Sequence, residues 1–223
     1  MTTLHLLTLE RERVRKKLTS NLFGVEPQPL RVGRFEVLRR LGRGGSCIVY
    51  AAFDPELHRE VAIKLLSGTV DREQMLHEAR ALAGLAHPNV LTVFETGVHD
   101  GVDFIITEFV HGGSLREWVT SLSERGRYGK LLSVLVQVGR GLEAAHRRGL
   151  VHRDVKPENV LIKDDVLKLA DFGSCRGIYS KPPFTEYIST RWYRAPECLL
   201  TNGFYGYKMD MWSVGCVMFE VMK

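Results

Sequence analysis

The feature that most constrains this 223-residue chain is a polar loop followed at short range by a second acidic motif. Residues 152–159 read His-Arg-Asp-Val-Lys-Pro-Glu-Asn, and residues 171–173 read Asp-Phe-Gly. Between them, residues 166–170 alternate in the way that is typical of a strand. An aspartate, a lysine and an asparagine within one loop, with a further aspartate after a strand, indicate a site rather than a core.

The chemistry of these side chains points to phosphoryl transfer. Asp154 can accept a proton from a hydroxyl group, and Lys156 can neutralise a phosphoryl group in transit. Asn159 and Asp171 offer the amide and carboxylate oxygens that Mg²⁺ prefers. Such a transfer needs in-line positioning and charge neutralisation more than covalent help, and this set offers both.

Composition excludes several other classes of protein. Hydrophobic residues make up 44% of the chain and charged residues 26%, which argues against wholesale disorder. The net charge of +5 comes from interleaved basic and acidic residues, so no nucleic-acid partner is expected. The four cysteines form no close pair, which favours a reducing setting, in the cytoplasm or alternatively the nucleus, without a zinc or disulfide framework. No apolar run is long enough for a membrane span.

The hydrophobic pattern divides the chain into three parts. Residues 1–32 form an N-terminal extension, in which a short helix is the first interpretation and a partner-binding or membrane-surface helix the alternative. Residues 33–108 are predicted to form a small β-rich lobe, and residues 109–223 a mainly helical one. The expected strands and helices are strands 35–38, 48–53, 61–66, 90–94 and 104–109, and helices 72–86 and 128–148.

Two features of the first lobe suit an anionic ligand. Residues 42–49, Gly-Arg-Gly-Gly-Ser-Cys-Ile-Val, form a glycine-rich hairpin whose backbone N–H groups can approach phosphate oxygens. Lys64 lies on the next apolar strand and needs an anionic partner, for which Glu78 is the candidate on the expected helix. Each feature alone is weak, because glycine-rich turns and edge-strand lysines are common.

Two later motifs complete an ordered series. Residues 195–197 read Ala-Pro-Glu, and residues 210–215 read Asp-Met-Trp-Ser-Val-Gly. From about residue 35 to residue 223 the chain resembles a eukaryotic-type protein kinase domain. The resemblance implies an α+β, bilobal fold with an antiparallel N-lobe sheet plus one main helix, and a mainly helical C-lobe that lacks its last helices.

The resemblance also implies a role for each matching residue, with ATP and Mg²⁺ as cofactors. Asp154 is the catalytic base, and Lys156 neutralises the transferring phosphoryl group. Lys64 pairs with Glu78 and with the α- and β-phosphates. Asp210 braces the catalytic loop, residues 152–159. Asn159 and Asp171 bind the metal. Leu82, Val93, His152 and Phe172 resemble the stacked regulatory spine. The residues that resemble the nucleotide-binding set are Leu41, Gly42, Gly44, Val49, Ala62, Lys64, Thr107, Glu108, Val110 and Leu161.

A lysine two residues after Asp154, here Lys156, resembles the serine/threonine class of protein kinases. Residues 189–197 resemble the mitogen-activated and cyclin-dependent kinase group. Residues 185–187, Thr-Glu-Tyr, resemble the phosphorylation site of mitogen-activated kinases. This resemblance implies that phosphates at Thr185 or Tyr187 order the activation segment through arginines such as Arg153 and Arg191. An upstream kinase or autophosphorylation would add them. The implied partners are protein substrates with a Ser or Thr target, with a preference for proline after it.

Residues 151–218 resemble the mitogen-activated and cyclin-dependent kinase group, whereas residues 34–150 resemble bacterial Ser/Thr kinases. One interpretation is a fusion of two kinase types with a seam between about residues 125 and 165.

The leading hypothesis is an ATP-dependent Ser/Thr protein kinase. The alternative is a truncated, inactive kinase fragment that binds a nucleotide or a partner. A small-molecule phosphotransferase is disfavoured, because such an enzyme needs no Ala-Pro-Glu segment.

Overall fold

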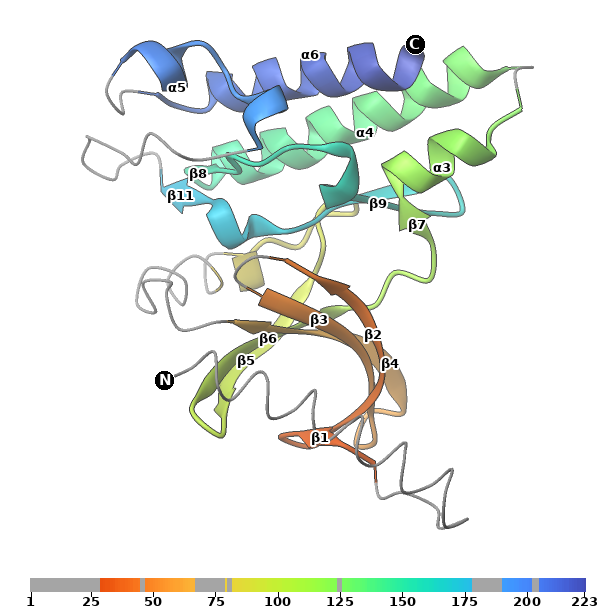
Figure 1. The fold of residues 1–223 in the computed structure, drawn as a ribbon, viewed down its shortest axis with the longest axis vertical. Helices are drawn as coiled ribbons and strands as arrows, with labels where there is room; N and C mark the ends of the chain where they lie inside the picture. Colours follow the sequence, from red (N-terminus) through yellow and green to blue (C-terminus); the bar gives the residue numbers. More distant parts are fainter. Residues whose placement is uncertain are drawn as a thin grey trace. The chain divides into compact units, whose positions relative to one another are not determined.

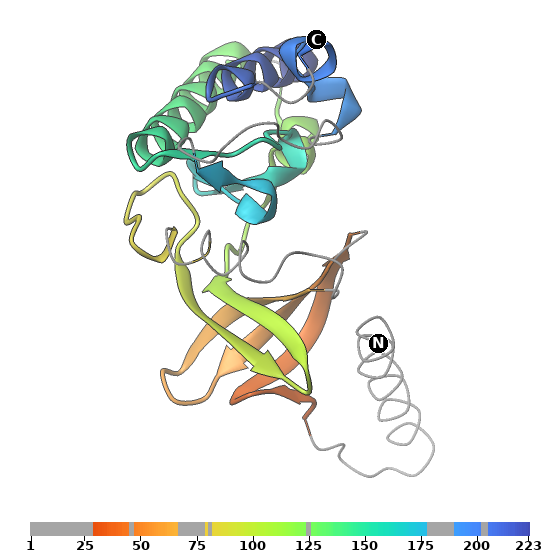
Figure 2. The ribbon, with the colours of Figure 1, turned by 90° about the vertical axis from the view of Figure 1, so that its left-hand side faces the viewer.

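Six antiparallel strands form a curled sheet in the first of two units of the chain (Figures 1 and 2). The computed structural model describes residues 29–44, 47–66, 79, 82–123, 126–177, 190–201 and 205–223. In order across the sheet, the strands are β1 (Arg31–Val32), β2 (Phe35–Arg43), β3 (Cys47–Asp54), β4 (Arg59–Leu66), β6 (Val102–Glu108) and β5 (Val93–His99). The antiparallel N-lobe sheet expected from the sequence is confirmed.

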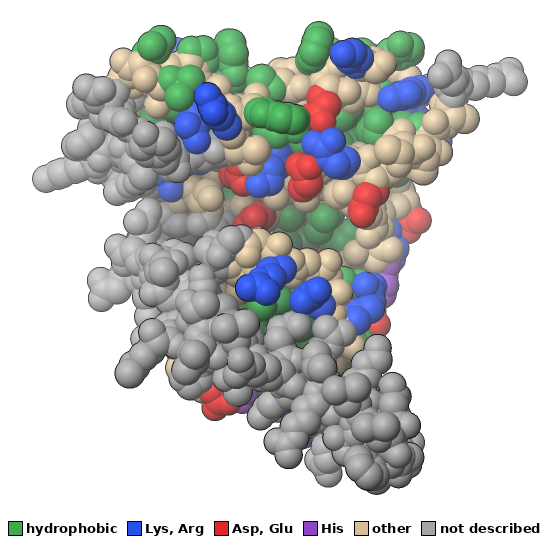
Figure 3. Space-filling model, in the orientation of Figure 1, with side chains coloured by type: hydrophobic (Ala, Val, Ile, Leu, Met, Phe, Trp, Pro, Cys, Tyr) green, Lys and Arg blue, Asp and Glu red, His purple; other side chains and the backbone are tan. Residues whose placement is uncertain are grey.

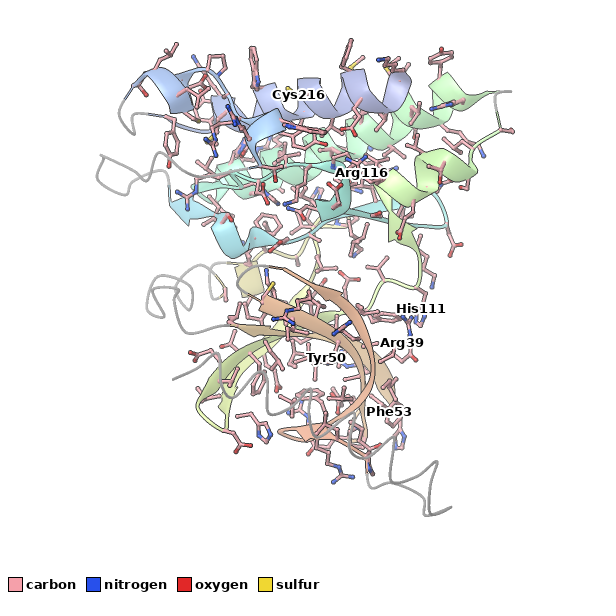
Figure 4. All side chains as sticks on the ribbon, in the orientation of Figure 1. Arg39, Tyr50, Phe53, His111, Arg116 and Cys216 are labelled. Carbon is pink, nitrogen blue, oxygen red and sulfur yellow. The ribbon has the colours of Figure 1, made fainter. Side chains whose placement is uncertain are left out.

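The alternation along β4 explains how the sheet acquires a core on one face. Val61, Ile63 and Leu65 are each at most 1% exposed, because successive side chains of a strand point to opposite faces. Phe35 and Tyr50, from β2 and β3, are buried in the same cluster, and Figure 4 labels Tyr50 within the sheet. The other face of β4 carries Glu60, Ala62 and Lys64, with Leu66 at its end.

An ion-pair network ties the start of this sheet to its far edge. The Arg34 guanidinium donates to both carboxylate oxygens of Asp54, over 3.3 and 3.4 Å, and to Glu95 on β5 over 2.8 Å. The Asp54 side chain is fully buried, and its Oδ1 also accepts from the backbone N–H of Leu57. Burial alone would raise the pKa of Asp54, but these hydrogen bonds outweigh burial and hold the pKa below its ordinary value.

Two expected elements differ from the structure or lie outside it. The strand expected at residues 90–94 is β5, which begins only at Val93 and runs to His99. Val90 instead forms an isolated parallel bridge with Leu169, because the preceding His-Pro-Asn turn sends the chain across to another strand. Most of the expected helix 72–86 and all of residues 1–28 lie outside the described residues; the described part of that helix ends at residue 83, before Gly84.

Three helices give the second unit its framework. They are α3 (Leu115–Ser121), α4 (Arg127–Arg147) and α6 (Lys208–Met222), and both ribbon views show α4 and α6 side by side (Figures 1 and 2). The expected helix 128–148 is confirmed as α4. Its buried face follows the helical period: Leu131, Val134, Leu135, Val138, Gly141, Leu142 and Ala145. Among the described residues, no helix is long and apolar enough to cross a membrane.

Short strands and turns connect these helices and carry the polar motifs. β9 (Val160–Lys163) and β10 (Val166–Leu169) form a hairpin, to which β7 (Gly113–Ser114) adds a third strand. β8 (Leu150–Val151) pairs with β11 (Arg176–Gly177). One-turn helices lie at η1 (Pro157–Asn159), η2 (Phe172–Ser174), η3 (Arg191–Tyr193) and α5 (Glu197–Leu200).

Candidate active site

The loop after β8 is held by one buried carboxylate. Asp210, in the first turn of α6, is fully buried, and its Oδ1 accepts from the backbone N–H of Arg153 over 2.8 Å. Its Oδ2 accepts from the backbone N–H of His152 over 2.9 Å and lies 2.8 Å from the Nε2 atom of His146. Residues 152–156 have no regular structure, so this side chain satisfies donors that a helix or strand would otherwise satisfy. Asp210 therefore braces the loop, as the resemblance implied.

Asp154 lies at the centre of a hydrogen-bonded cluster. Its Oδ1 accepts from the backbone N–H of Thr190 over 2.9 Å and from the Thr190 hydroxyl over 3.1 Å. Its Oδ2 accepts from Lys156 Nζ over 2.7 Å and from Asn159 Nδ2 over 3.1 Å. Lys156 Nζ also donates to the Thr190 hydroxyl over 3.1 Å. The carboxylate is thus oriented from both sides, and a cation lies beside it.

The hairpin β9–β10 brings the two candidate metal ligands to one end. Val160 pairs with Leu169, and the backbone N–H of Ala170 donates to the carbonyl of Asn159 over 2.8 Å. Asn159 precedes the first strand and Asp171 follows the second, so the antiparallel ladder places them at the same end of the hairpin. Leu161, expected at the nucleotide, lies within β9 and pairs with Ser114 on β7.

The donor set of this end suits Mg²⁺. Both hydrogen bonds of the Asn159 side chain use its amide nitrogen, which leaves the amide oxygen as the ligand atom. Within the described parts of the chain, no group of three or more His, Cys, Asp or Glu side chains could hold a metal ion. A site of one carboxylate and one amide oxygen fits Mg²⁺, which keeps waters and takes its other ligands from phosphates.

The first unit gathers its own share of the predicted residues on one face of the sheet. Val49 pairs with Lys64, and Ala62 pairs with Thr107, so these four side chains occupy neighbouring rows of the face opposite the core. Gly42 pairs with Val49 and joins the same rows. Of the other nucleotide-binding candidates described, Leu41 lies within β2 at a register shift, and Gly44 follows that strand. Glu108 ends β6, and Val110 follows it in the second unit. Glu78 lies outside the described residues, so its pairing with Lys64 stays a prediction.

The family comparison decides what this arrangement belongs to. The protein kinase domain matches residues 35–223. The chain belongs to the protein kinase family. The bilobal protein kinase fold inferred from the sequence is confirmed by this match.

The kinase domain is similar to curated relatives from several kingdoms. It is 49% identical to the human MAPK/MAK/MRK overlapping kinase over 164 residues, which cover 69% of this chain and 37% of that protein. It is 37% identical to cyclin-dependent kinase F-3 of Oryza sativa subsp. japonica over 194 residues, covering 84% and 44%. A probable serine/threonine-protein kinase of Bifidobacterium longum is 34% identical over 210 residues, covering 88% and 27%. The chain spans less than half the length of these relatives.

The eukaryotic and bacterial resemblances overlap along the chain. Alignments that cover 69% and 88% of the chain both pass through its middle, where the sequence alone suggested a seam between two kinase types.

Two packed aromatic rings connect the catalytic loop of the kinase domain to residues 171–173. The ring centroids of His152 and Phe172 are 4.5 Å apart, and His152 Nε2 lies 3.0 Å from the carbonyl oxygen of Ala170. These are two of the four predicted spine residues. Leu82 is buried in the second unit, and Val93 belongs to the first.

Arg153 of the kinase domain has an unusual conformation and three acceptors. Its φ of 68° lies in the left-handed region, and the residue is 7% exposed. Nε donates to the carbonyl of Ser174 over 2.5 Å, and the terminal nitrogens reach the carbonyl of Cys175 and the hydroxyl of Tyr205. The resemblance assigned Arg153 to a phosphate on Thr185 or Tyr187, but both lie outside the described residues.

Sequence reasoning missed Thr190 as a functional residue. Its hydroxyl and its backbone N–H both contact Asp154, although 36 residues separate the two in sequence. The available signal was position, because Thr190 lies in the stretch that resembled the mitogen-activated and cyclin-dependent kinase group. The motif was recognised, but no contact to the loop was inferred from it.

Proposed function

We propose that this domain transfers the γ-phosphoryl group of ATP to Ser and Thr hydroxyls of proteins. The observation that carries the proposal is the Asp154 cluster, in which a carboxylate is held beside Lys156 by Thr190 and Asn159. A carboxylate in this position is a proton acceptor for an attacking hydroxyl, and an adjacent ammonium group favours charge on the transferring phosphoryl. Membership of the protein kinase family supports proteins as the substrate class.

Each residue of the site has a separate proposed role. Asp154 orients the substrate hydroxyl and accepts its proton. Lys156 neutralises negative charge on the phosphoryl group as it moves from ATP to that hydroxyl. Asn159 and Asp171 would hold Mg²⁺, which supplies neutralisation of the β- and γ-phosphate charge when bound. Lys64, with Ala62, Val49 and the glycine-rich hairpin, would bind the nucleotide from the sheet.

The intact mass of the purified chain after incubation with Mg²⁺-ATP tests this function. A gain of about 80 Da, the mass of one phosphoryl group, is expected in wild type and not in Asp154→Asn, because an amide cannot accept the proton. Asp165→Asn, in the exposed turn of the β9–β10 hairpin, is the matched control and keeps the gain. ATP binding without any mass gain in wild type would instead support a nucleotide-binding fragment that does not turn over.

Regulation by the activation segment is part of the proposal. Phosphates at Thr185 or Tyr187, added by autophosphorylation or an upstream kinase, would pair with an exposed arginine, and Arg191 on η3 is exposed. Arg191→Gln should then reduce the activation that phosphorylation brings, while leaving the unphosphorylated rate unchanged. Equal activation in both proteins would contradict this role.

A preference for proline after the target residue is proposed from the likeness of residues 189–197 to the mitogen-activated and cyclin-dependent kinase group. Paired peptides that differ only by Pro or Ala at that position measure it directly. A higher kcat/KM with proline is expected, and equal values would remove this part of the proposal.

A further inference from the structure

Four side chains from four separate elements converge beside the catalytic loop, and the proposed mechanism uses none of them. These are Arg116 on α3, Glu158 on η1, Tyr193 on η3 and Glu220 on α6, here called the Arg116 cluster. Figure 4 labels Arg116. Arg116 Nε donates to Glu158, one terminal nitrogen lies 2.9 Å from Glu220, and the other donates to the Tyr193 hydroxyl over 3.1 Å. One guanidinium therefore joins three elements.

Tyr193 is fixed at both ends. Its hydroxyl donates to Glu220 over 2.5 Å, and its backbone carbonyl accepts from the Ser213 hydroxyl over 2.8 Å. Both partners belong to α6, and Tyr193 is 4% exposed. Burial and the hydrogen bond to Glu220 raise the pKa of Tyr193, so its hydroxyl keeps its proton and remains a donor. The segment from Thr190 to Tyr193 is thus anchored on α6.

The ion pairs of the cluster are too exposed to be explained by stability. The side chains of Arg116 and Glu158 are each 46% exposed, and that of Glu220 is 34% exposed. Pairs as accessible as these contribute little to the free energy of unfolding, because water screens them. The planar guanidinium instead offers fixed directions to several acceptors at once, which suits it to holding elements in register.

The elements held in register both contact the proposed base. Glu158 is the neighbour of Asn159, whose side chain donates to Asp154. Tyr193 lies in the same short segment as Thr190, which contacts the other oxygen of Asp154. A shift of either element would turn the Asp154 carboxylate.

We propose that Arg116 is a positioning residue for phosphoryl transfer, which holds the catalytic loop and residues 190–193 in the arrangement that orients Asp154. This inference rests on the proposed kinase function. It assigns Arg116 an effect on the rate of transfer and not on nucleotide binding, because none of the contacts of the cluster involves a residue assigned to the nucleotide.

Steady-state kinetics on a peptide library with Ser or Thr at its centre test the proposal. Arg116→Ala should lower kcat about ten- to a hundred-fold, the range expected when a catalytic group is misplaced, with the KM for ATP within about twofold of wild type. Its melting temperature should change little. Arg116→Lys should recover only part of the rate, because one ammonium group cannot reach all three partners.

The matched control is Arg147→Ala. Arg147 is an exposed arginine of α4 that makes an ion pair with Glu143 over 2.6 Å within one helix. Its removal changes the charge equally and should leave kcat unchanged. A wild-type kcat in Arg116→Ala, or an equal loss in both variants, would overturn the proposal.

Hydrogen–deuterium exchange separates this inference from the proposed function. Arg116→Ala should speed exchange in residues 157–160 and 190–195 but not in the middle of α4, whether or not the protein transfers phosphate. If wild type transferred no phosphate and Arg116→Ala still exchanged faster in these segments, the positioning contact would be supported and the kinase function contradicted. Unchanged exchange in both segments, or faster exchange throughout the second unit, would overturn the positioning role itself.

Discussion

At the scale of single residues, two aspartates of the second unit have opposite surroundings. Asp210 is fully buried and accepts hydrogen bonds from two consecutive backbone N–H groups and the ring of His146. The Asp154 side chain keeps 12% of its surface exposed and is bonded by side chains that could rearrange around a substrate. The first is therefore a fixed support, whereas the second can act as a proton acceptor.

Replacing Thr190 by valine should slow phosphoryl transfer without unfolding the protein. Valine has the shape of threonine, but it lacks the hydroxyl that bonds Asp154 and Lys156. A hydrogen bond to a charged group is worth about 1.5–3 kcal/mol, so the loss of the one that orients Asp154 should lower kcat about ten- to a hundred-fold. Initial rates at saturating ATP give the measurement.

Two further variants make that result specific. Thr190→Ser keeps the hydroxyl and should restore most of the rate. Thr201→Val removes a hydroxyl that donates to the Glu197 carbonyl over 2.5 Å, away from the catalytic loop, and should leave the rate unchanged. If Thr190→Val turned over as fast as wild type, the hydroxyl would have no part in orienting Asp154.

At the scale of elements, the buried carboxylate at the end of β3 predicts how stability depends on pH. The pKa of Asp54 is lower in the folded protein than its unfolded value of 3.8, so the unfolded state binds more protons as the pH falls. The stabilisation from the Arg34 pair is therefore present above about pH 4 and is lost as the pH falls through the lower folded pKa.

Asp54→Asn should therefore lower the urea midpoint at pH 7, and the difference from wild type should shrink below pH 4. Asp164→Asn, in the exposed turn between β9 and β10, is the control and should track wild type at every pH. A deficit of Asp54→Asn that stayed constant between pH 7 and pH 3 would show that the ionised pair is not its cause.

Two glycines of α4 should respond oppositely to alanine. A Cβ at Gly141 would lie 2.6 Å from the backbone carbonyl oxygen of Asn89, which packs against the helix, whereas a Cβ at Gly139 would meet nothing within 4 Å. Gly141→Ala should cost about 1–3 kcal/mol through overpacking. Gly139→Ala should add about 0.5–1 kcal/mol, since alanine favours the helix. Chemical denaturation measures both, and a stabilised Gly141→Ala would mean that the 87–92 loop gives way.

Whether an element was predicted depended on its surroundings in the sequence. The strands β2, β3, β4, β6 and β10 and the helix α4 were predicted from their apolar patterns. β9 is as short as β10 but was missed, because it directly follows a motif that was interpreted as a loop. β5 was placed three residues early, because Val90 is apolar yet serves the bridge to Leu169. The local pattern of apolar residues cannot distinguish a residue within a strand from a residue that forms a single bridge to a distant strand.

The same limit applies to the candidate site. Asp154, Asn159 and Lys156 were found because they share one motif, and the structure brings them together. Thr190 and Arg116 were not found, since each reaches the loop from a distant part of the chain through tertiary packing. Sequence motifs identify the groups with chemical roles more readily than the groups that hold them in place.

At the scale of the whole molecule, large apolar side chains remain exposed on α5 and α6. Leu200 is 80% exposed and Phe219 is 73% exposed, and hydrophobic atoms line the upper edge of the space-filling view (Figure 3). Other side chains of these helices are also at least 40% exposed: Leu199, Met211, Trp212 and Met218. Exposed apolar area of this kind favours association.

Light scattering across a concentration series should detect this association. The double variant Leu200→Glu and Phe219→Glu should remain monomeric at concentrations where wild type associates, because burying a carboxylate at a contact is unfavourable. Leu57→Glu, in the turn between β3 and β4, places a charge at another exposed leucine and should associate like wild type. Equal association of all three proteins would exclude α5 and α6 from the contact.

The β9–β10 hairpin has a consequence for protein engineering. Its ladder fixes Asn159 and Asp171 at one end, while the exposed turn at Asp164 and Asp165 closes the other. Added residues at that turn would lengthen the loop without changing the pairing of Val160 with Leu169. A peptide tag inserted between Asp164 and Asp165 should therefore be tolerated, and would give a labelling point on the catalytic unit that leaves both proposed metal ligands in place.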